Sequence, residues 1–411
     1  MLKVLWSAAL SLGLAVSAVA QSGTYSNITE YPVPNAHSGP WGIATGPDGA
    51  LWFADYGDGK IGRITTAGAV TEYPVPTAAS QPWGIAAGPD GALWFTESNA
   101  GKVGRITTGG EVTEYPVAPG SYPKGIAAGP DGALWFVLNF YDQIGRITTR
   151  GDITLYSLPS SPSWPVEIAA GPDGALWFTE SAGQRIGRIT TAGAITEYTL
   201  PTANTAPFGI TAGPDGALWF TESVDRKTGE IGRITTAGDI TEYALPAVSG
   251  RPFGIAAGSD GALWFTENYS DKIGRITTEG VVTEYPTPAD YCFGIAAGPD
   301  GGLWFTETNA GLIGRAPACG LGLAATFAGS TLTMNFDLAI DTPATFNILL
   351  HSATGDWRPF SQPIPAVVPP RAFTMTWNGV PNLGDVKVQA VLTAGTGQVI
   401  CSQWNGVNTA R

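Results

Sequence analysis

Along most of the chain, apolar and polar residues form short runs with a two-residue alternation. A representative stretch, Gly84 to Val117, contains the runs GIAAGP, ALWFTE, KVGRIT and EVTEYPV, separated by the turn sequences GPDG, SNAG and TGG. Short runs rich in β-branched and aromatic residues and bounded by Gly, Pro, Asn and Asp predict β-strands. In ALWFTE, Leu93 and Phe95 point to one face and Trp94 to the other, so both faces are apolar, as in sheets packed on both sides. The pattern predicts an all-β domain of stacked sheets.

These four runs belong to a unit that occurs seven times. The segment GPDGALWF, or a close variant, recurs with a spacing of roughly 40 to 45 residues. Its aspartate stands at Asp48, Asp90, Asp131, Asp173, Asp215, Asp260 and Asp300. Four short antiparallel strands per unit predict the blades of a β-propeller. An open solenoid would have the same period, so the ends of the repeat must distinguish the two.

The ends of the repeat favour a closed ring. The seventh unit stops after LIGRA at Ala316 and lacks its fourth strand, while an unmatched fourth strand, NITEYPVP from Asn27 to Pro34, precedes the first unit. Joining the two would complete the last blade and remove both free sheet edges. The sequence therefore predicts a seven-bladed propeller over residues 26–316, closed by an N-terminal strand.

Residues 317–411 do not continue the repeat. They contain the strand-like runs STLTMNFDL, ATFNILLHS, AFTMTWNGV and VKVQAVLT, broken by Pro-rich turns, which predicts a small β-sandwich domain. Cys319 and Cys401 bracket this domain and are its expected disulfide, because the chain is expected to reach an oxidising compartment. Cys292 is the remaining thiol, either a nucleophile or a buried and inert side chain.

Residues 1–20 have the features of a cleavable signal peptide. Lys3 is followed by an apolar run from Val4 to Val16 and by Ala18-Val19-Ala20, a small-x-small cleavage signal. This predicts a secreted or periplasmic protein; a signal anchor is the alternative. No later segment approaches about 20 uninterrupted apolar residues, so no membrane span is expected in the mature chain.

The charge of the chain argues against nucleic acid as a partner. The formal net charge is -13 and only 13% of the residues are charged, whereas proteins that bind nucleic acid present clustered Lys and Arg to phosphates.

A candidate site follows from strand direction, because the turns between blades and those joining second to third strands share one face of the disc. The residues after the blade-opening Pro or Cys are Trp41, Trp83, Lys124, Val166, Phe208, Phe253 and Phe293. The residues that end the second strands are Asp55, Glu97, Leu138, Glu180, Glu222, Glu267 and Glu307. The aromatic set is either a binding platform or packing at the channel mouth. The acids either form part of a site or satisfy backbone donors and the repeated arginines, such as Arg105 and Arg188.

Blades three and four depart most from the repeat. Lys124 replaces an aromatic residue, Glu167 replaces the glycine of PxGI and Leu138 replaces an acid. Aromatic residues crowd the nearby turns, namely Tyr122, Phe140, Tyr141 and Trp164. This suggests a lopsided pocket with one cation, one anion and aromatic walls; neutral drift is the alternative.

Histidine is scarce, which limits acid–base catalysis. The chain has only His37 and His351. His37 lies in the turn before blade one, and ring closure would bring it near Asp290, Cys292 and Glu307. A solvated loop histidine is the simpler interpretation.

The repeated sequence motifs resemble those of the virginiamycin B (streptogramin B) lyase family. They are LWFTE, IGRIT, ITEYPVP and PxGI, and the resemblance extends from Ile28 to about Arg315. The resemblance implies a seven-bladed propeller and a magnesium-dependent elimination that opens a cyclic depsipeptide ester without water. It also implies histidines at the positions of Phe253 and Phe293, a glutamate at Tyr291 and an acid at Glu307 or, with a shifted gap, at Thr308. Only Glu307 is retained, as the one catalytic and metal-ligand candidate.

Three functions remain open. The first is an exported module that binds a small molecule, glycan or protein, with Trp41, Trp83, Lys124, Trp164, Glu167, Phe208, Phe253, Tyr291 and Phe293 as candidate contacts. The second is a metal-dependent carbon–oxygen lyase that uses Glu307 with Mg²⁺. The third is a structural surface protein, for which near-identical blades suffice.

Overall fold

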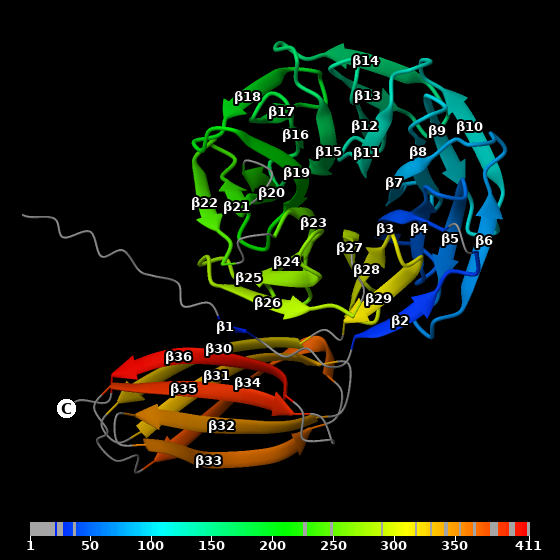
Figure 1. Ribbon diagram of the computed structural model, residues 1–411. Coiled ribbons are helices and arrows are strands. Elements are labelled where there is room, and N and C mark those ends of the chain that lie inside the picture. The colour runs from blue at the N-terminus through cyan, green and yellow to red at the C-terminus, as the bar shows by residue number, and fades with distance from the viewer. Residues whose placement is uncertain are drawn as a thin grey trace, which may run out of the picture.

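A computed structural model shows a ring of seven β-sheets around a central axis (Figure 1). The structure describes residues 21–22, 28–35, 38–224, 228–246, 250–288 and 291–316, and the backbone of the strands between residues 319 and 408. The predicted signal peptide, His37 and Asp290 lie outside the described residues. Among the described residues, no helix is long and apolar enough to cross a membrane.

Each blade is a four-stranded antiparallel sheet whose first strand faces the axis and whose fourth strand lies at the rim (Figure 1). Blades one to three comprise β3 (Pro40–Thr45), β4 (Leu51–Asp55), β5 (Lys60–Ile64), β6 (Val70–Pro74), β7 (Pro82–Ala87), β8 (Leu93–Glu97), β9 (Lys102–Ile106), β10 (Val112–Pro116), β11 (Pro123–Ala128), β12 (Leu134–Leu138), β13 (Gln143–Ile147) and β14 (Ile153–Ser157). Blades four and five comprise β15 (Pro165–Ala170), β16 (Leu176–Glu180), β17 (Arg185–Ile189), β18 (Ile195–Thr199), β19 (Thr205–Ala212), β20 (Leu218–Val224), β21 (Thr228–Ile234) and β22 (Ile240–Ala244). Blades six and seven comprise β23 (Pro252–Ala257), β24 (Leu263–Glu267), β25 (Lys272–Ile276), β26 (Val282–Pro286), β27 (Cys292–Ala297), β28 (Leu303–Glu307) and β29 (Leu312–Ala316).

The ring closes as the sequence predicts. Strand β2 (Thr29–Pro32) pairs antiparallel with β29, with Thr29 opposite Arg315, and becomes the outer strand of blade seven. The strand is shorter than the predicted run from Asn27 to Pro34. A second N-terminal strand, β1 (Gln21–Ser22), pairs in parallel with β26 at the rim of blade six, a contact that the repeat did not indicate.

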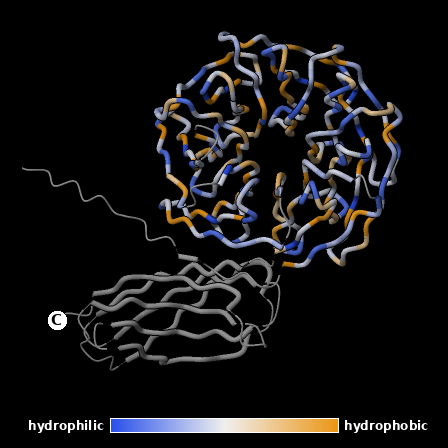
Figure 2. The backbone as a smooth tube through the Cα atoms, viewed as in Figure 1, coloured by the Kyte–Doolittle hydropathy of each residue, from blue (hydrophilic) through white to orange (hydrophobic). Residues whose placement is uncertain are grey.

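The core consists of the second strands, which are buried throughout, as the two-faced apolar pattern requires. Hydrophobic and hydrophilic stretches alternate within each blade (Figure 2). In blade two, Trp94 donates from Nε1 to Asp90 at 3.0 Å, and Arg105 donates to the other carboxylate oxygen of Asp90 at 2.6 Å. The tryptophan and arginine bonds together hold the pKa of Asp90 below its usual value despite partial burial. The same triad recurs in every blade and ties the first turn to the second and third strands.

Neighbouring blades contact one another through a tyrosine and a glycine. Tyr31 of β2 stacks on Trp304 with ring centroids 5.5 Å apart, and its ring lies against Gly68 of blade one. Gly68 has φ +88°, a conformation that favours glycine, and a Cβ there would collide with the Tyr31 ring. The tyrosines of blades one to five contact the corresponding glycines of blades two to six in the same way. This contact therefore joins neighbouring blades into the ring.

After the propeller, the chain forms two antiparallel sheets; their packing as a β-sandwich stays a prediction. Their strands are β30 (Cys319–Ala328), β31 (Thr331–Ile340), β32 (Ala344–Ser352), β33 (Gly355–Ile364), β34 (Val367–Asn378), β35 (Asp385–Thr393) and β36 (Val399–Asn408), in the orders β30-β31-β34 and β33-β32-β35-β36. The predicted bond between Cys319 and Cys401 concerns side chains outside the described residues.

We expect Gly68→Ala to destabilise the propeller more than Gly49→Ala does. Gly49 also has a positive φ, of +72°, but nothing lies within 4 Å of a Cβ there. Gly49→Ala therefore adds only backbone strain, about 1 kcal/mol, whereas Gly68→Ala adds the collision with Tyr31, for a total of about 2–4 kcal/mol. Urea unfolding followed by tryptophan fluorescence measures the difference; equal losses would contradict the role of the tyrosine contact in closing the ring.

Candidate functional site

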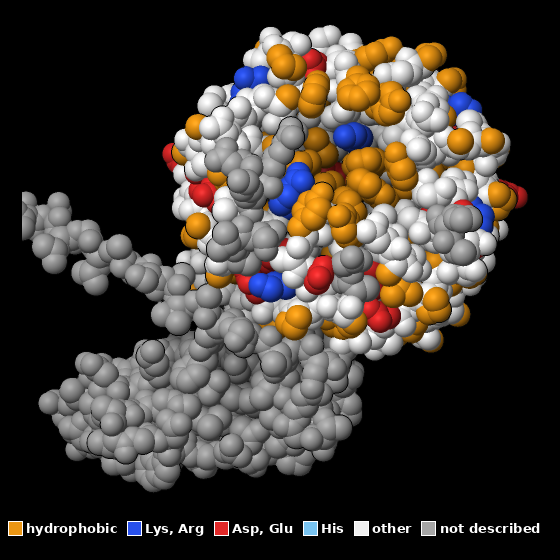
Figure 3. All heavy atoms as spheres, in the orientation of Figure 1, with side chains coloured by type: hydrophobic (Ala, Val, Ile, Leu, Met, Phe, Trp, Pro, Cys, Tyr) orange, Lys and Arg blue, Asp and Glu red, His pale blue; other side chains and the backbone are white. Residues whose placement is uncertain are grey.

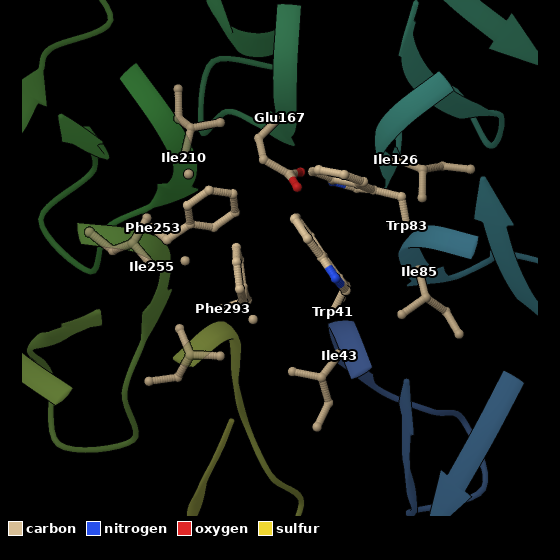
Figure 4. Close-up of a pocket in the computed structure, with 16 residues that line it drawn as sticks. Trp41, Ile43, Trp83, Ile85, Ile126, Glu167, Ile210, Phe253, Ile255 and Phe293 are labelled. Carbon is tan, nitrogen blue, oxygen red and sulfur yellow. The ribbon is translucent and has the colours of Figure 1, made fainter. Parts of the chain in front are cut away.

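A hollow with an empty volume of about 650 Å³ lies at the centre of one face of the disc. Hydrophobic side chains gather around it, with Lys and Arg side chains close by (Figure 3). The side chains of Trp41, Trp83, Glu167, Phe253 and Phe293 project toward its centre from the first strands of five blades (Figure 4).

The first strands direct these side chains into the hollow because each contains a β-bulge. In blade one, Pro40 lies opposite Asp55 and Ile43 lies opposite Phe53, so the register shifts by one residue between them. A bulge kinks a strand and redirects its side chains. The shift occurs at the same place in all seven blades, so the residue after each opening Pro or Cys is placed at the channel mouth.

The aromatic side chains that the sequence singled out form a continuous belt, defined here as Trp41, Trp83, Phe208, Phe253 and Phe293. Trp41 lies 3.9 Å from Trp83 and 4.1 Å from Phe293 between ring centroids. Phe253 lies 4.7 Å from Phe293 and 4.9 Å from Phe208. All five remain partly exposed. The belt therefore packs against itself and still presents aromatic surface to the hollow.

Blade four interrupts the belt with a carboxylate. Its first strand has Glu167 where other blades have glycine, and a Cβ on neighbouring Gly125 would collide with the Glu167 side chain. Burial raises the pKa of Glu167 to about 7. Burial also lowers the pKa of Lys124 to about 8, a shift that the charge of Glu167 opposes. Lys124 Nζ lies 4.6 Å from the centroid of the Trp83 ring, a cation–π contact that joins the polar pair to the belt.

The structure separates the other aromatic residues of blades three and four from the hollow. Trp164 and Phe140 are 51% and 56% exposed and lie 6.5 Å apart between centroids. Phe140 also contacts Tyr122 at 4.6 Å, and none of these residues lines the hollow. The predicted lopsided pocket thus divides into two parts: Glu167 at the hollow, with Lys124 on the Trp83 ring beside it, and an exposed patch formed by Tyr122, Phe140 and Trp164.

A second hollow of about 460 Å³ adjoins the belt between blades five and seven, lined by Phe208, Arg251, Pro252, Phe253, Asn268, Tyr269 and Phe293. The Arg251 guanidinium carbon lies 5.2 Å from the Tyr269 ring centroid, and its Nε donates to Ser223 Oγ at 3.2 Å. Tyr269 in turn contacts Tyr291 edge-on at 5.2 Å. Sequence reasoning missed Arg251, which precedes the opening Pro252, and Tyr269, which lies in the turn after β24, because it considered only the residue after each opening Pro and the last residue of each second strand.

The acids that end the second strands do not line the channel. All six are fully buried within their blades. The expected pairing with the repeated arginines is wrong for Arg105 and Arg188, which pair with Asp90 and Asp173 at the opposite ends of their strands. The other interpretation, that these acids accept hydrogen bonds from backbone donors, is confirmed for Asp55, which accepts from the Gly39 N–H at 2.8 Å. Glu180 instead pairs with Arg185 at 3.3 Å.

The positions implied by the lyase resemblance do not make a magnesium site. The phenyl rings of Phe253 and Phe293 contact each other and offer no ligand atom, and Tyr291 stands at the position of the expected glutamate. Glu307 is buried and pairs in register with Cys292, which is also buried. Mg²⁺ prefers several oxygen ligands in octahedral geometry, which these side chains cannot supply.

The buried acids predict a pH-dependent stability. Burial, reinforced by the neighbouring Glu114 carboxylate, raises the pKa of Glu97 to about 8. A carboxyl group whose pKa is raised on folding stabilises the protein fully below its unfolded pKa and loses this effect as pH rises through its folded pKa. We therefore expect the free energy of unfolding to fall between pH 5 and pH 9, and Glu97→Gln to reduce the total fall over this range by about 2 kcal/mol. Urea unfolding at several pH values measures both slopes, and identical slopes would contradict the raised pKa.

Comparison with known proteins finds one matching family and related propeller structures. It matches the model of the virginiamycin B lyase family over residues 4–222 and 168–321. A streptogramin B lyase structure is 41% identical with a TM-score of 0.67, and the match covers 70% of this chain and 96% of that chain. A catalytically inactive histidine-to-alanine variant of virginiamycin B lyase from Staphylococcus aureus, solved with quinupristin, is also 41% identical, with a TM-score of 0.66 and coverage of 70% and 98%.

More distant matches show only the fold. The extracellular domain of a hybrid two-component system protein from B. thetaiotaomicron is 11% identical with a TM-score of 0.58, and the match covers 94% of this chain and 60% of that chain. The family match spans more than half of the chain, and the propeller reproduces the closure and blade count that the resemblance implied. The chain belongs to the virginiamycin B lyase family.

Proposed function

We propose that this chain is an exported binding propeller that captures a small, largely apolar molecule in the central hollow. The observation that carries the proposal is the aromatic belt, whose five side chains stay partly exposed; four of them, Trp41, Trp83, Phe253 and Phe293, line the central hollow, and Phe208 lines the adjoining one. Exposed aromatic surface in a concavity is typical of ligand sites, because aromatic rings bury a large area at a small cost in conformational entropy.

The polar pair supports a ligand with a polar group at one side. Lys124 contacts the belt through Trp83, and Glu167 lines the hollow beside it. Desolvation brings the pKa of Lys124 to about 8 and that of Glu167 to about 7. A ligand that displaces water from this region would strengthen its interaction with either group, since electrostatic attraction increases in a less polar environment. The pair would thus fix the orientation of the ligand, and the belt would supply most of the binding energy.

The family supports the location of this site. A relative 41% identical to this chain was solved with quinupristin, so a propeller of this family accommodates a small organic ligand. The predicted signal peptide supports export, which would place the hollow in contact with ligands outside the cytoplasm.

We expect Trp41→Ala and Trp83→Ala each to weaken ligand binding by about 30-fold, the loss typical of a central aromatic contact. A library of small amphiphilic molecules and cyclic peptides, quinupristin included, is screened by thermal shift, and hits are titrated by calorimetry. Trp164→Ala is the matched control, because Trp164 lies outside the hollow and its substitution should leave affinity unchanged. A library without hits would favour an inert surface protein, and hits insensitive to Trp41→Ala would contradict the assigned site.

A second candidate is the family's lyase activity, which sequence identity of 41% favours. Elimination needs a base to remove the proton next to the carbonyl and an electrophile to stabilise the developing charge. Phe253 and Phe293 can provide neither, and Glu307 is buried behind the first strand.

We expect no opening of a streptogramin B by the purified protein in the presence of Mg²⁺. An elimination product has the same mass as its substrate, so chromatography with fragment-ion mass spectrometry is required to detect it. A linear product that forms with the wild-type chain and disappears with Glu307→Gln would establish the lyase function instead.

A further inference from the structure

Most blades contain a buried group of two acids and a cation beside the hairpin that joins the second and third strands. In blade two the group is Glu97, Lys102 and Glu114, with Glu97 and Lys102 paired in register on β8 and β9. Lys102 Nζ lies 2.6 Å from Glu114 Oε2, and Thr77 Oγ1 donates to the same oxygen at 2.8 Å. The cation offsets the charge of carboxylates that have little access to water.

The cation stands at the same register position in three other blades. Lys60 pairs with Glu72 at 3.4 Å in blade one, and Lys272 pairs with Glu284 at 2.6 Å in blade six. In blade four, Arg185 lies within 3.5 Å of carboxylates on both neighbouring strands. In blades one, two, four and six, the first residue of the third strand therefore supplies a positive charge beside the two acids.

Blade five has an acid where these blades have the cation. Glu230 pairs in register with Glu222 across β20 and β21, and Glu242 occupies the fourth strand opposite Gly232. Thr202 Oγ1 donates to Glu242 at 2.6 Å, as Thr77 does to Glu114 in blade two. The surroundings of the cation are preserved, but the cation itself is exchanged for a third carboxylate.

The three carboxylates converge without a described positive partner. Oxygen atoms of Glu222, Glu230 and Glu242 lie within 4.8 Å of one another, and none of the three forms an ion pair within the described part of the chain. Glu222 is fully buried. Its Oε2 accepts from Thr205 Oγ1 at 2.8 Å, but its Oε1 accepts no hydrogen bond, and neither does the buried Oε2 of Glu230. Burial together with the two neighbouring carboxylates raises the pKa of Glu222 to about 8.

We propose that blade five binds a calcium ion between Glu222, Glu230 and Glu242, at the place where sister blades hold an ammonium or guanidinium group. Ca²⁺ takes oxygen ligands at about 2.3–2.6 Å, so oxygens that all lie within 4.8 Å of one another can share one such ion. Mg²⁺ requires shorter distances and stricter geometry. The group contains no His or Cys, and so offers none of the ligands that zinc prefers.

Blade one offers an internal contrast. Asp55, Asp58 and Glu72 also bring carboxylate oxygens within 4.8 Å of one another, but Lys60 Nζ lies 3.2 Å from Asp58 and 3.4 Å from Glu72. The basic residue already supplies the positive charge there. Only the blade-five group, among those that the described residues form, combines three carboxylates with no cation.

The test compares thermal unfolding and calorimetric titration of the purified protein with Ca²⁺, with Mg²⁺ and after treatment with EDTA. We expect one calcium ion per propeller and a melting temperature that rises with Ca²⁺ by mass action. An absent response to Ca²⁺ would overturn the site, and an equal response to Mg²⁺ would overturn the assignment to calcium.

Glu230→Lys gives the sharpest variant, because it recreates the arrangement of blade two. It should abolish the response to Ca²⁺ and raise the melting temperature in EDTA above that of the wild type. Glu230→Gln should weaken Ca²⁺ binding by about 100-fold or more, since even residues that only support a metal ligand are worth 10- to 100-fold. Glu111→Lys is the control, because it makes the same change of charge at an exposed position and should retain the full response. A Ca²⁺ response that survives in Glu230→Lys would overturn the proposal.

Discussion

The structure depends on the pairing of one short N-terminal strand with the last blade. Strand β2 gives blade seven its outer strand, and Tyr31 on that strand stacks on Trp304 and lies against Gly68. Without this pairing, blade seven would expose a sheet edge and blade one would lose the contact between Gly68 and Tyr31. The central hollow exists only because the first strands of all seven blades face a common axis, so the site inherits its geometry from a contact at the rim.

Within this ring, two repeated features fix the shape of each blade, one at the end far from the hollow and one at the hollow itself. The aspartate, tryptophan and arginine triad fastens the far end of every blade, and the bulge in the first strand turns one residue per blade into the channel. The bulge is a property of the backbone, and the triad lies away from the channel, so both tolerate changes in the side chain that the first strand presents. Trp41, Lys124 and Phe253 occupy equivalent positions and differ completely in chemistry. A propeller can therefore change its ligand without changing its fold.

The sequence was sufficient for the parts of the molecule that follow from period and strand direction. Seven copies, a missing final strand and an unmatched first strand predict a closed ring, and alternation of strands places Trp41 and Asp55 at the same end of blade one.

The sequence was insufficient wherever depth within a blade matters. The end of a strand says on which face of the disc a residue lies, but not whether its side chain turns toward the channel or into the sheet. For this reason the acids such as Glu97 were grouped with the aromatic residues, although they are buried between strands. Arg105 lies opposite Trp94, near Asp90 and far from Glu97, so it pairs with Asp90. Sequence spacing alone does not show this register.

Repetition also gives meaning to single departures from the pattern. Phe253 and Phe293 extend the aromatic belt at positions where the lyase resemblance implies histidines, and their contact removes ligand atoms from the channel while adding apolar surface. Glu230 reverses the charge at a position that four sister blades keep positive, and the buried carboxylates around it still require compensation. In both cases the other blades show which residue the repeat usually has at that position. A fold without repeats offers no such comparison. The chemistry of this protein is therefore best sought where one blade differs from the other six, because the shared residues are already accounted for by the ring.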